Sequence, residues 1–104
     1  ITESTRPMTI AHLRTYTINK GHLDSWLELF PKLIPLMEEA NIKVECSWVN
    51  EERTQFIWIR SYGDSVENIA KYEAQFYGSD WWLANVDHVR SHIAHREIVQ
   101  IETT

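Results

Sequence analysis

The sequence has few cysteines, glycines and prolines: one, three and three respectively in 104 residues. The single cysteine, Cys46, excludes an internal disulfide and a zinc site built from several cysteines. Acidic residues outnumber Lys and Arg by 15 to 10, and the net charge of −5 argues against general nucleic-acid binding. The sequence also lacks a Gly-rich phosphate loop and a dinucleotide fingerprint, which disfavours nucleotide cofactors.

No apolar run is long enough to span a bilayer, and no secretory leader is recognisable. We therefore expect a cytoplasmic protein that does not insert into a membrane. Apolar residues make up 43% of the chain, which is enough for the core of one domain. We expect that domain to span residues 8–104, after a flexible N-terminal arm at residues 1–7.

One strand, predicted at residues 8–18, organises the rest of the chain. Its side chains alternate between two faces, and β-branched and aromatic residues fill it. One face carries Ile10, His12, Arg14, Tyr16 and Ile18. This face mixes titratable side chains with aliphatic ones. It is therefore either a solvated face of the sheet or the wall of a pocket.

The spacing of apolar residues predicts the remaining elements. Residues 22–40 repeat apolar side chains every three or four positions, as an amphipathic helix does. Pro31 and Pro35 lie inside this stretch, so we expect a kink there or two short helices. The other predicted elements are strands at 42–49, 55–62 and 95–101, and helices at about 64–77 and 79–93.

This order of elements is that of the ferredoxin-like βαββαβ fold, of the α+β class. We expect a four-stranded antiparallel sheet with helices on one face and nothing on the other. The alternation along the strands assigns four apolar residues to the uncovered face: Leu13, Ile57, Ile59 and Ile98. An exposed apolar sheet face needs a partner, and the simplest arrangement is a homodimer that pairs sheet against sheet.

Three stretches of the chain resemble NIPSNAP-type domains. The first is Leu13-Arg14-Thr15-Tyr16-Thr17, followed by Gly21 and a helix that carries Trp26, Leu27 and Phe30. The others are Ile57-Trp58-Ile59-Arg60-Ser61-Tyr62 and Ser79-Asp80-Trp81. The chain departs from the family at Lys20-Gly21, where members commonly have Pro-Gly, and the helix prolines have no clear match in the family.

This resemblance implies a dimeric α/β barrel, in which two ferredoxin-like sheets pair. The wider superfamily includes cofactor-independent monooxygenases, polyketide cyclases and haem-handling proteins, so the fold by itself selects no reaction. NIPSNAP-like proteins are not tied to one established reaction either.

Two arginines are the main candidates for binding a substrate. If the polar face of strand 8–18 meets the helices, Arg14 lies near Arg60 of the neighbouring central strand. Two guanidinium groups suit a carboxylate, phenolate or enolate. The alternative is that both arginines form internal salt bridges, with Glu45, Glu73 or Glu97 as partner. Tryptophans are the expected apolar walls of the pocket: Trp26, Trp58, Trp81 and Trp82.

Histidines and tyrosines are the candidates for proton transfer. His12 or His88 would act as a general base, because the ordinary pKa of histidine suits proton abstraction at neutral pH. Tyr16 or Tyr72 would donate a hydrogen bond to the substrate. His88 and His92 have the i, i+4 spacing of metal ligands, but no third ligand and no His-Glu-x-x-His motif accompany them. We therefore expect no metal.

The function predicted from these features is that of a small cofactor-independent enzyme of the monooxygenase or cyclase type. Its substrate would be an aromatic or polyketide-like anion, held in a pocket between the sheet and the helices. The alternative is a non-catalytic module of the NIPSNAP type that binds a ligand or another protein. Haem binding through one of the histidines is a third possibility.

Overall fold

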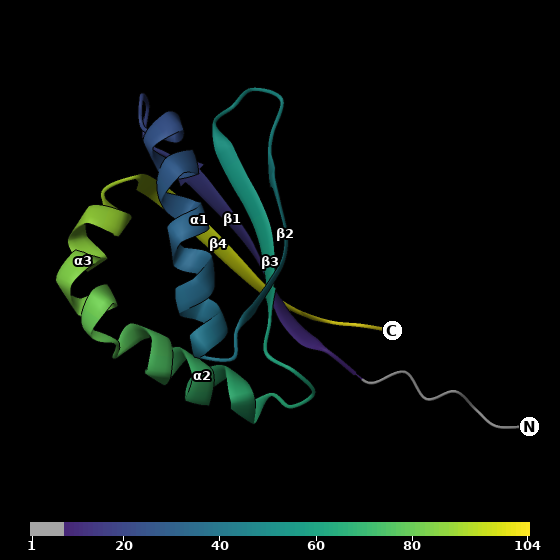
Figure 1. Ribbon diagram of the computed structural model, residues 1–104. Helices are drawn as coiled ribbons and strands as arrows, with labels where there is room; N and C mark the ends of the chain where they lie inside the picture. Colours follow the sequence, from purple (N-terminus) through teal and green to yellow (C-terminus); the bar gives the residue numbers. More distant parts are fainter. Residues whose placement is uncertain (1–7) are drawn as a thin grey trace, which may run out of the picture.

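The computed structural model describes residues 8–104, so the predicted arm at residues 1–7 lies outside the described part (Figure 1). Its elements are, in chain order, β1 (Ile10–Ile18), α1 (Leu23–Glu39), β2 (Lys43–Val49), β3 (Gln55–Ser61), α2 (Glu67–Tyr77), α3 (Asp80–Arg90) and β4 (Ile93–Glu102). Each element predicted between residues 8 and 104 is present, with ends that differ by a few residues.

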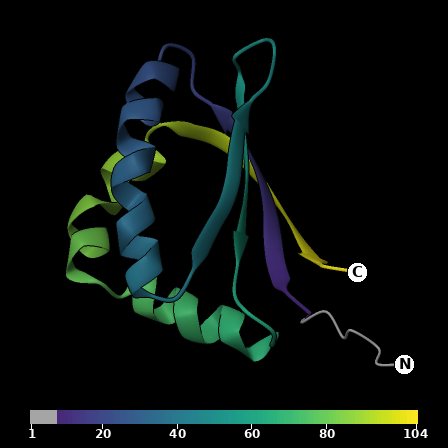
Figure 2. The same ribbon diagram turned by 45° about the vertical axis from the view of Figure 1, so that its right-hand side comes forward.

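The four strands form one sheet in the order β2-β3-β1-β4, and all neighbouring strands are antiparallel. The helices lie on one side of this sheet (Figure 2). The predicted ferredoxin-like α+β fold is therefore confirmed, with β1 and β3 as the central strands. Within residues 8–104, no helix is long and apolar enough to cross a membrane.

Helix α1 turns its apolar face to the sheet and its prolines to solvent. The buried residues of α1 are Trp26, Leu29, Phe30, Leu33 and Met37. Pro31 and Pro35 are exposed and lie four residues apart, on the face away from the sheet. A carbonyl that loses its hydrogen bond to a proline on that face can bind water instead. Helix α1 is unbroken from Leu23 to Glu39, so the alternative of two short helices is wrong.

Residues with positive φ make the turns at both ends of α1. Gly21 has a φ of 84° between β1 and α1, a conformation that is open to glycine because it has no Cβ. Asn41 has a φ of 66° and turns the chain from α1 into β2. The two turns bring α1 back across the sheet, where it covers the central strands (Figure 1).

The register of the central strands places the polar face of β1 against the helices. His12 is opposite Arg60 on β3, and Arg14 is opposite Trp58. Both arginines are buried. The interpretation of this strand face as a solvated surface is therefore wrong, because the face lies in the interior between the sheet and the helices.

The opposite face, which we call the outer face, is uncovered and carries a row of apolar side chains that crosses its strands. Leu13, Ile59 and Val99 lie side by side across β1, β3 and β4. Trp48, on β2 beside Ile57, is 55% exposed, and Val99 is 53% exposed. The prediction that Ile98 belongs to this face is wrong, because Ile98 pairs with Arg14 and so points to the side of the helices.

Candidate functional site

Glu73 of α2 joins the two central strands through a buried group of polar side chains. Its Oε2 atom accepts hydrogen bonds from Arg60 Nη2 at 2.7 Å, Tyr62 Oη at 2.8 Å and Arg14 Nη2 at 3.3 Å. The arginine side chains are 3% and 2% exposed, and that of Glu73 is 23% exposed. We call Glu73, Arg14, Arg60 and Tyr62 the Glu73 cluster.

The internal salt bridges expected as one alternative for the two arginines are therefore present. Their partner is Glu73. Glu45 instead accepts a hydrogen bond from Ser61 on the outer face, and Glu97 lies 3.7 Å from His95. Glu73 is placed to meet both arginines because it interrupts the apolar stripe of α2, which is the stripe that faces the sheet.

The Glu73 cluster carries one more positive charge than negative charge. Within residues 8–104, Glu73 is the one carboxylate within 4.0 Å of Arg14 or Arg60. His12 lies 3.8 Å from Glu73, but burial and the charge of Arg14 lower its pKa below 6.5, so it is neutral at pH 7. An unpaired buried charge is costly, and the cluster therefore favours an anion beside it.

Hydrogen bonds assign the protons around Tyr62. Its single O–H donates to Glu73, while its oxygen accepts a bond from Arg60 Nε at 2.6 Å. His12 Nδ1 lies 3.0 Å from the same oxygen, so this nitrogen carries the proton of the neutral ring. Burial raises the pKa of Tyr62. Burial acts in the same direction on Glu73, but the hydrogen bond from Tyr62 and the charge of Arg60 outweigh it and hold the pKa of Glu73 below 4.5.

We expect the free energy of unfolding to fall as the pH drops below about 6.5. Because the pKa of His12 is lower in the folded state, the unfolded chain binds a proton over this range that the folded chain does not. A second loss follows below about pH 4.5, because the unfolded chain then protonates this carboxyl group while folded Glu73, whose pKa is lower, stays ionised. Urea unfolding at a series of pH values measures both losses.

The matched variants for this titration are His12→Gln and His95→Gln, since His95 is exposed. His12→Gln should flatten the dependence just below about pH 6.5, and His95→Gln should keep the wild-type slope. An unchanged slope in His12→Gln would contradict a neutral, buried His12.

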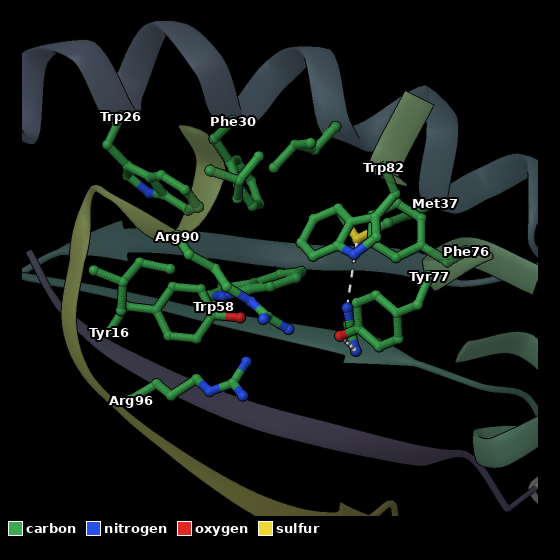
Figure 3. A pocket seen from close by; sticks show the side chains of 14 residues that line it. Tyr16, Trp26, Phe30, Met37, Trp58, Phe76, Tyr77, Trp82, Arg90 and Arg96 are labelled. Atoms are coloured by element: carbon green, nitrogen blue, oxygen red, sulfur yellow. Dashed lines mark hydrogen bonds between the residues drawn. The ribbon is translucent and has the colours of Figure 1, made fainter. Parts of the chain in front are cut away.

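A pocket lies beside the Glu73 cluster, and we call it the Trp58 pocket (Figure 3). Its aromatic lining comes from two strands and three helices: Tyr16, Trp26, Phe30, Trp58, Phe76, Tyr77 and Trp82. Three arginines also line it: Arg60, Arg90 and Arg96. Its internal volume is about 40 Å³, which leaves room for a few water molecules.

The Trp58 pocket brings together half of the residues that the sequence predicts for the site. The predicted residues that line it are Tyr16, Trp26, Trp58, Arg60 and Trp82. Those that do not line it are His12, Arg14, Tyr72, Trp81 and His88. Arg14 belongs to the Glu73 cluster and His12 contacts it. His88 is exposed on α3, and Tyr72 and Trp81 are partly buried. The predicted roles of all ten in binding or proton transfer stay predictions.

The remaining lining residues are not among those predicted from the sequence: Phe30, Leu33, Met37, Phe76, Tyr77, Val89, Arg90, Ile93 and Arg96. A signal existed for Tyr77, which follows Glu73 by one helical turn on α2. Arg96 was missed because the prediction placed Ile98 on the outer face. Residues 96 and 98 share one face of a strand, so Arg96 was assigned to the outer face as well. In the observed register Arg96 lies opposite Tyr16, on the side of the helices.

Several hydrogen-bond donors around the pocket lack a good acceptor within residues 8–104. The indole Nε1 atoms of Trp26 and Trp58 are buried without a partner, and so is Arg14 Nε. Arg60 Nη1 has the thioether of Met37 at 3.8 Å, which is a weak acceptor. A buried donor without an acceptor costs about 1–3 kcal/mol. A ligand that brings oxygen atoms to these donors would recover part of that cost.

The histidine pair considered for metal binding is engaged elsewhere. His92 is buried, its Nε2 lies 2.8 Å from Ser25 Oγ, and its Nδ1 lies 2.9 Å from the backbone oxygen of His88. In the part of the chain that the structure describes, no group of three or more His, Cys, Asp or Glu side chains is placed to hold a metal ion. The pair links the end of α3 to the start of α1.

No family model matches the chain, and no curated protein matches it. A solved NIPSNAP family protein from Agrobacterium tumefaciens has a TM-score of 0.85 and 20% identity, covering 100% of this chain and 92% of that one. A NIPSNAP domain protein from Burkholderia xenovorans has a TM-score of 0.77 and 17% identity, covering 88% and 91%. A proposed antibiotic biosynthesis monooxygenase from Bordetella bronchiseptica has a TM-score of 0.69 and 13% identity, covering 95% and 99%. These likenesses confirm the predicted resemblance as one of fold: the chain has the ferredoxin-like fold of NIPSNAP domain and antibiotic biosynthesis monooxygenase structures.

Proposed function

We propose that the protein is a small cofactor-independent enzyme of the monooxygenase or cyclase type, whose substrate is an aromatic or polyketide-like anion. The observation that carries this proposal is the unbalanced positive charge of the Glu73 cluster at the edge of an aromatic pocket. Arg60 belongs to both the cluster and the pocket lining. An oxyanion beside Arg60 would balance the charge while its ring stays out of water.

The same contacts favour the reactive form of such a ligand. A phenol or enol is more acidic beside a guanidinium, because the opposite charge stabilises its ionised form. The ionised ring is electron-rich and reacts with dioxygen, or with a carbonyl of its own chain in a cyclisation. The Tyr16 oxygen accepts a hydrogen bond from Arg14 at 2.8 Å. Tyr77 accepts one from Arg60 at 2.9 Å, so each phenol keeps its own O–H to donate to the ligand.

4-Nitrophenol tests the pocket, because it has one ring and its colour reports ionisation. We expect bound 4-nitrophenol to have a pKa about one unit lower than the free probe, which corresponds to about 1.4 kcal/mol in favour of the anion. Arg60→Gln should abolish this shift while leaving Arg14 and Glu73 as a balanced pair, so that the fold is retained. Absorbance titration of the probe with and without protein measures the shift.

Arg53→Gln is the control for that titration, since Arg53 is an exposed arginine in the β2–β3 turn. It should bind and ionise the probe as the wild type does. The proposed anion site is wrong if wild-type protein leaves the probe's pKa unchanged, or if Arg60→Gln shifts it by as much as the wild type.

Turnover decides between an enzyme and a non-catalytic ligand-binding module of the NIPSNAP type. The enzyme predicts dioxygen uptake, or a cyclised product, from polycyclic phenols without added metal, flavin or haem. Arg60→Gln should remove that activity. Binding without any product across the panel would favour the module.

We also propose that two copies pair through the outer face to form a homodimer. Support comes from the exposed, apolar character of that face, which includes Trp48, Val99 and the half-buried Leu13, Ile57 and Ile59. Large apolar patches on a protein surface mark interaction sites. A two-fold dimer covers the same patch on both copies at once.

A further inference from the structure

We propose that Arg90 and Arg96 form a carboxylate-binding subsite at the mouth of the Trp58 pocket. The inference rests on the proposed function and narrows its substrate class. The ligand would be an aromatic acid, with a phenol or enol oxygen at Arg60 inside the pocket and a carboxylate at the two mouth arginines.

The two arginines reach the same place from different elements. Arg90 is the last residue of α3, and Arg96 lies on β4 opposite Tyr16. Both line the Trp58 pocket, and their guanidinium ends point toward its Tyr16 side (Figure 3). Both also line a more open groove of about 380 Å³ next to the pocket. Arg90, Ile93 and Arg96 are shared by the two, so the groove continues the pocket outward.

Arg90 and Arg96 differ from the other arginines in residues 8–104 in having no carboxylate partner. Arg14, Arg53 and Arg60 each lie within 4.0 Å of a carboxylate oxygen. No such ion pair is formed by Arg90 or Arg96 within the described residues. Two arginines without a carboxylate partner are unexpected in this chain, because it has 15 acidic residues for 10 Lys and Arg.

The acidic residues nearest in sequence do not neutralise the pair. Glu97 follows Arg96 but pairs with Thr15, so it points to the outer face, and its near neighbour is His95 at 3.7 Å. Asp87 precedes Arg90 by less than one turn on α3 and makes no ion pair with it. The mouth of the pocket is thus locally positive on a chain whose net charge is −5.

A carboxylate is an anion that suits two guanidinium groups at one pocket mouth. Each planar guanidinium can donate two parallel hydrogen bonds to the two oxygens of a carboxylate. The adjoining aromatic lining requires that the rest of the ligand be flat and apolar. One ligand therefore has to carry both features, with the acid at its outer end.

Entry of a ring requires movement at the mouth, since the internal volume of the pocket is about 40 Å³. Arg90 is exposed and has no ion pair within residues 8–104, so its side chain can turn outward without breaking a salt bridge. The buried arginines differ in this respect, because Arg14 and Arg60 are both held by Glu73. The mouth can thus open without breaking the ion pairs of Glu73.

Two matched probes test the subsite: 4-nitrophenol, and 5-hydroxy-2-nitrobenzoate, which is 4-nitrophenol with one added carboxylate. Isothermal titration calorimetry should show that the carboxylate probe binds the wild type at least about tenfold more tightly, as expected for hydrogen bonds to a charged group. Arg90→Gln/Arg96→Gln should reduce the ratio of the two affinities to about one. The measured quantity is the ratio of the two affinities. A variant that weakens the binding of both probes equally leaves this ratio unchanged.

Lys20→Gln/Lys32→Gln is the control of equal charge, because both lysines are exposed and lie outside the pocket lining. It should keep the wild-type ratio. Equal wild-type affinity for the two probes would overturn the subsite but leave the pocket intact. An advantage of the carboxylate probe that survives in Arg90→Gln/Arg96→Gln would overturn the assignment to these arginines. If neither probe binds, the proposed function and this inference both fail.

Discussion

Glu73→Gln should lower the free energy of unfolding by about 3 kcal/mol or more, which is the range for breaking a buried ion pair by removing one partner. The glutamine can still accept hydrogen bonds, so the loss isolates the charge. It leaves Arg14 and Arg60, both almost fully buried, without any carboxylate within reach in residues 8–104. Urea unfolding at neutral pH measures the change.

Glu28→Gln on α1 is the matched control, because Glu28 is exposed, and it should change stability by no more than about 0.5 kcal/mol. Adding Arg14→Met to Glu73→Gln removes one of the two stranded charges. The double variant should therefore lose less stability than the sum of its two single variants. If the losses of the two single variants simply add in the double variant, the charges of the cluster do not interact. Packing and hydrogen bonds would then hold the cluster together.

The same substitution separates stability from ligand binding. Glu73→Gln raises the excess positive charge of the cluster from one to two, so a bound phenolate should be favoured more strongly than in the wild type. Binding of 4-nitrophenolate should thus tighten while the protein becomes less stable. A variant that merely loosens the structure would weaken binding and stability together.

The fold was predictable because its signals are local. Alternation along β1 and the repeat of apolar residues in α1 depend on neighbours two to four positions away. The alternative of two short helices was wrong because the cost of a proline depends on which face of the helix it occupies. Pro31 and Pro35 both face solvent, so the helix continues through them.

The site was less predictable because it depends on register, which is a non-local property. The predicted alternation of β4 was off by one residue. It therefore assigned Ile98 and Arg96 to the outer face, whereas both lie on the side of the helices. The choice of Glu73 over Glu45 or Glu97 likewise depends on how α2 lies on the sheet. What the sequence did indicate was a carboxylate within an otherwise apolar helical stripe, and that residue holds the Glu73 cluster together.

Trp48→Lys/Val99→Lys should convert the proposed homodimer into a monomer. Both residues are exposed in the single copy, at 55% and 53%, so lysine at these positions should leave the fold of one copy intact. In a two-fold dimer each lysine enters the interface twice, and placing like charges together there costs several kcal/mol. A cost of about 4 kcal/mol weakens association about a thousandfold. Light scattering on a sizing column measures the mass of wild type and variant.

Leu83→Lys/Val66→Lys is the matched control, because these residues are apolar and exposed to a similar degree, at 64% and 51%, but lie outside the sheet. A dimer formed by the outer face should survive these changes. If the control dissociates and the outer-face variant does not, the copies pair through their helices. If the wild type is monomeric at all concentrations, the outer face does not bind a second copy. Its apolar surface would then be a site for another protein, which would favour the interaction module over the enzyme.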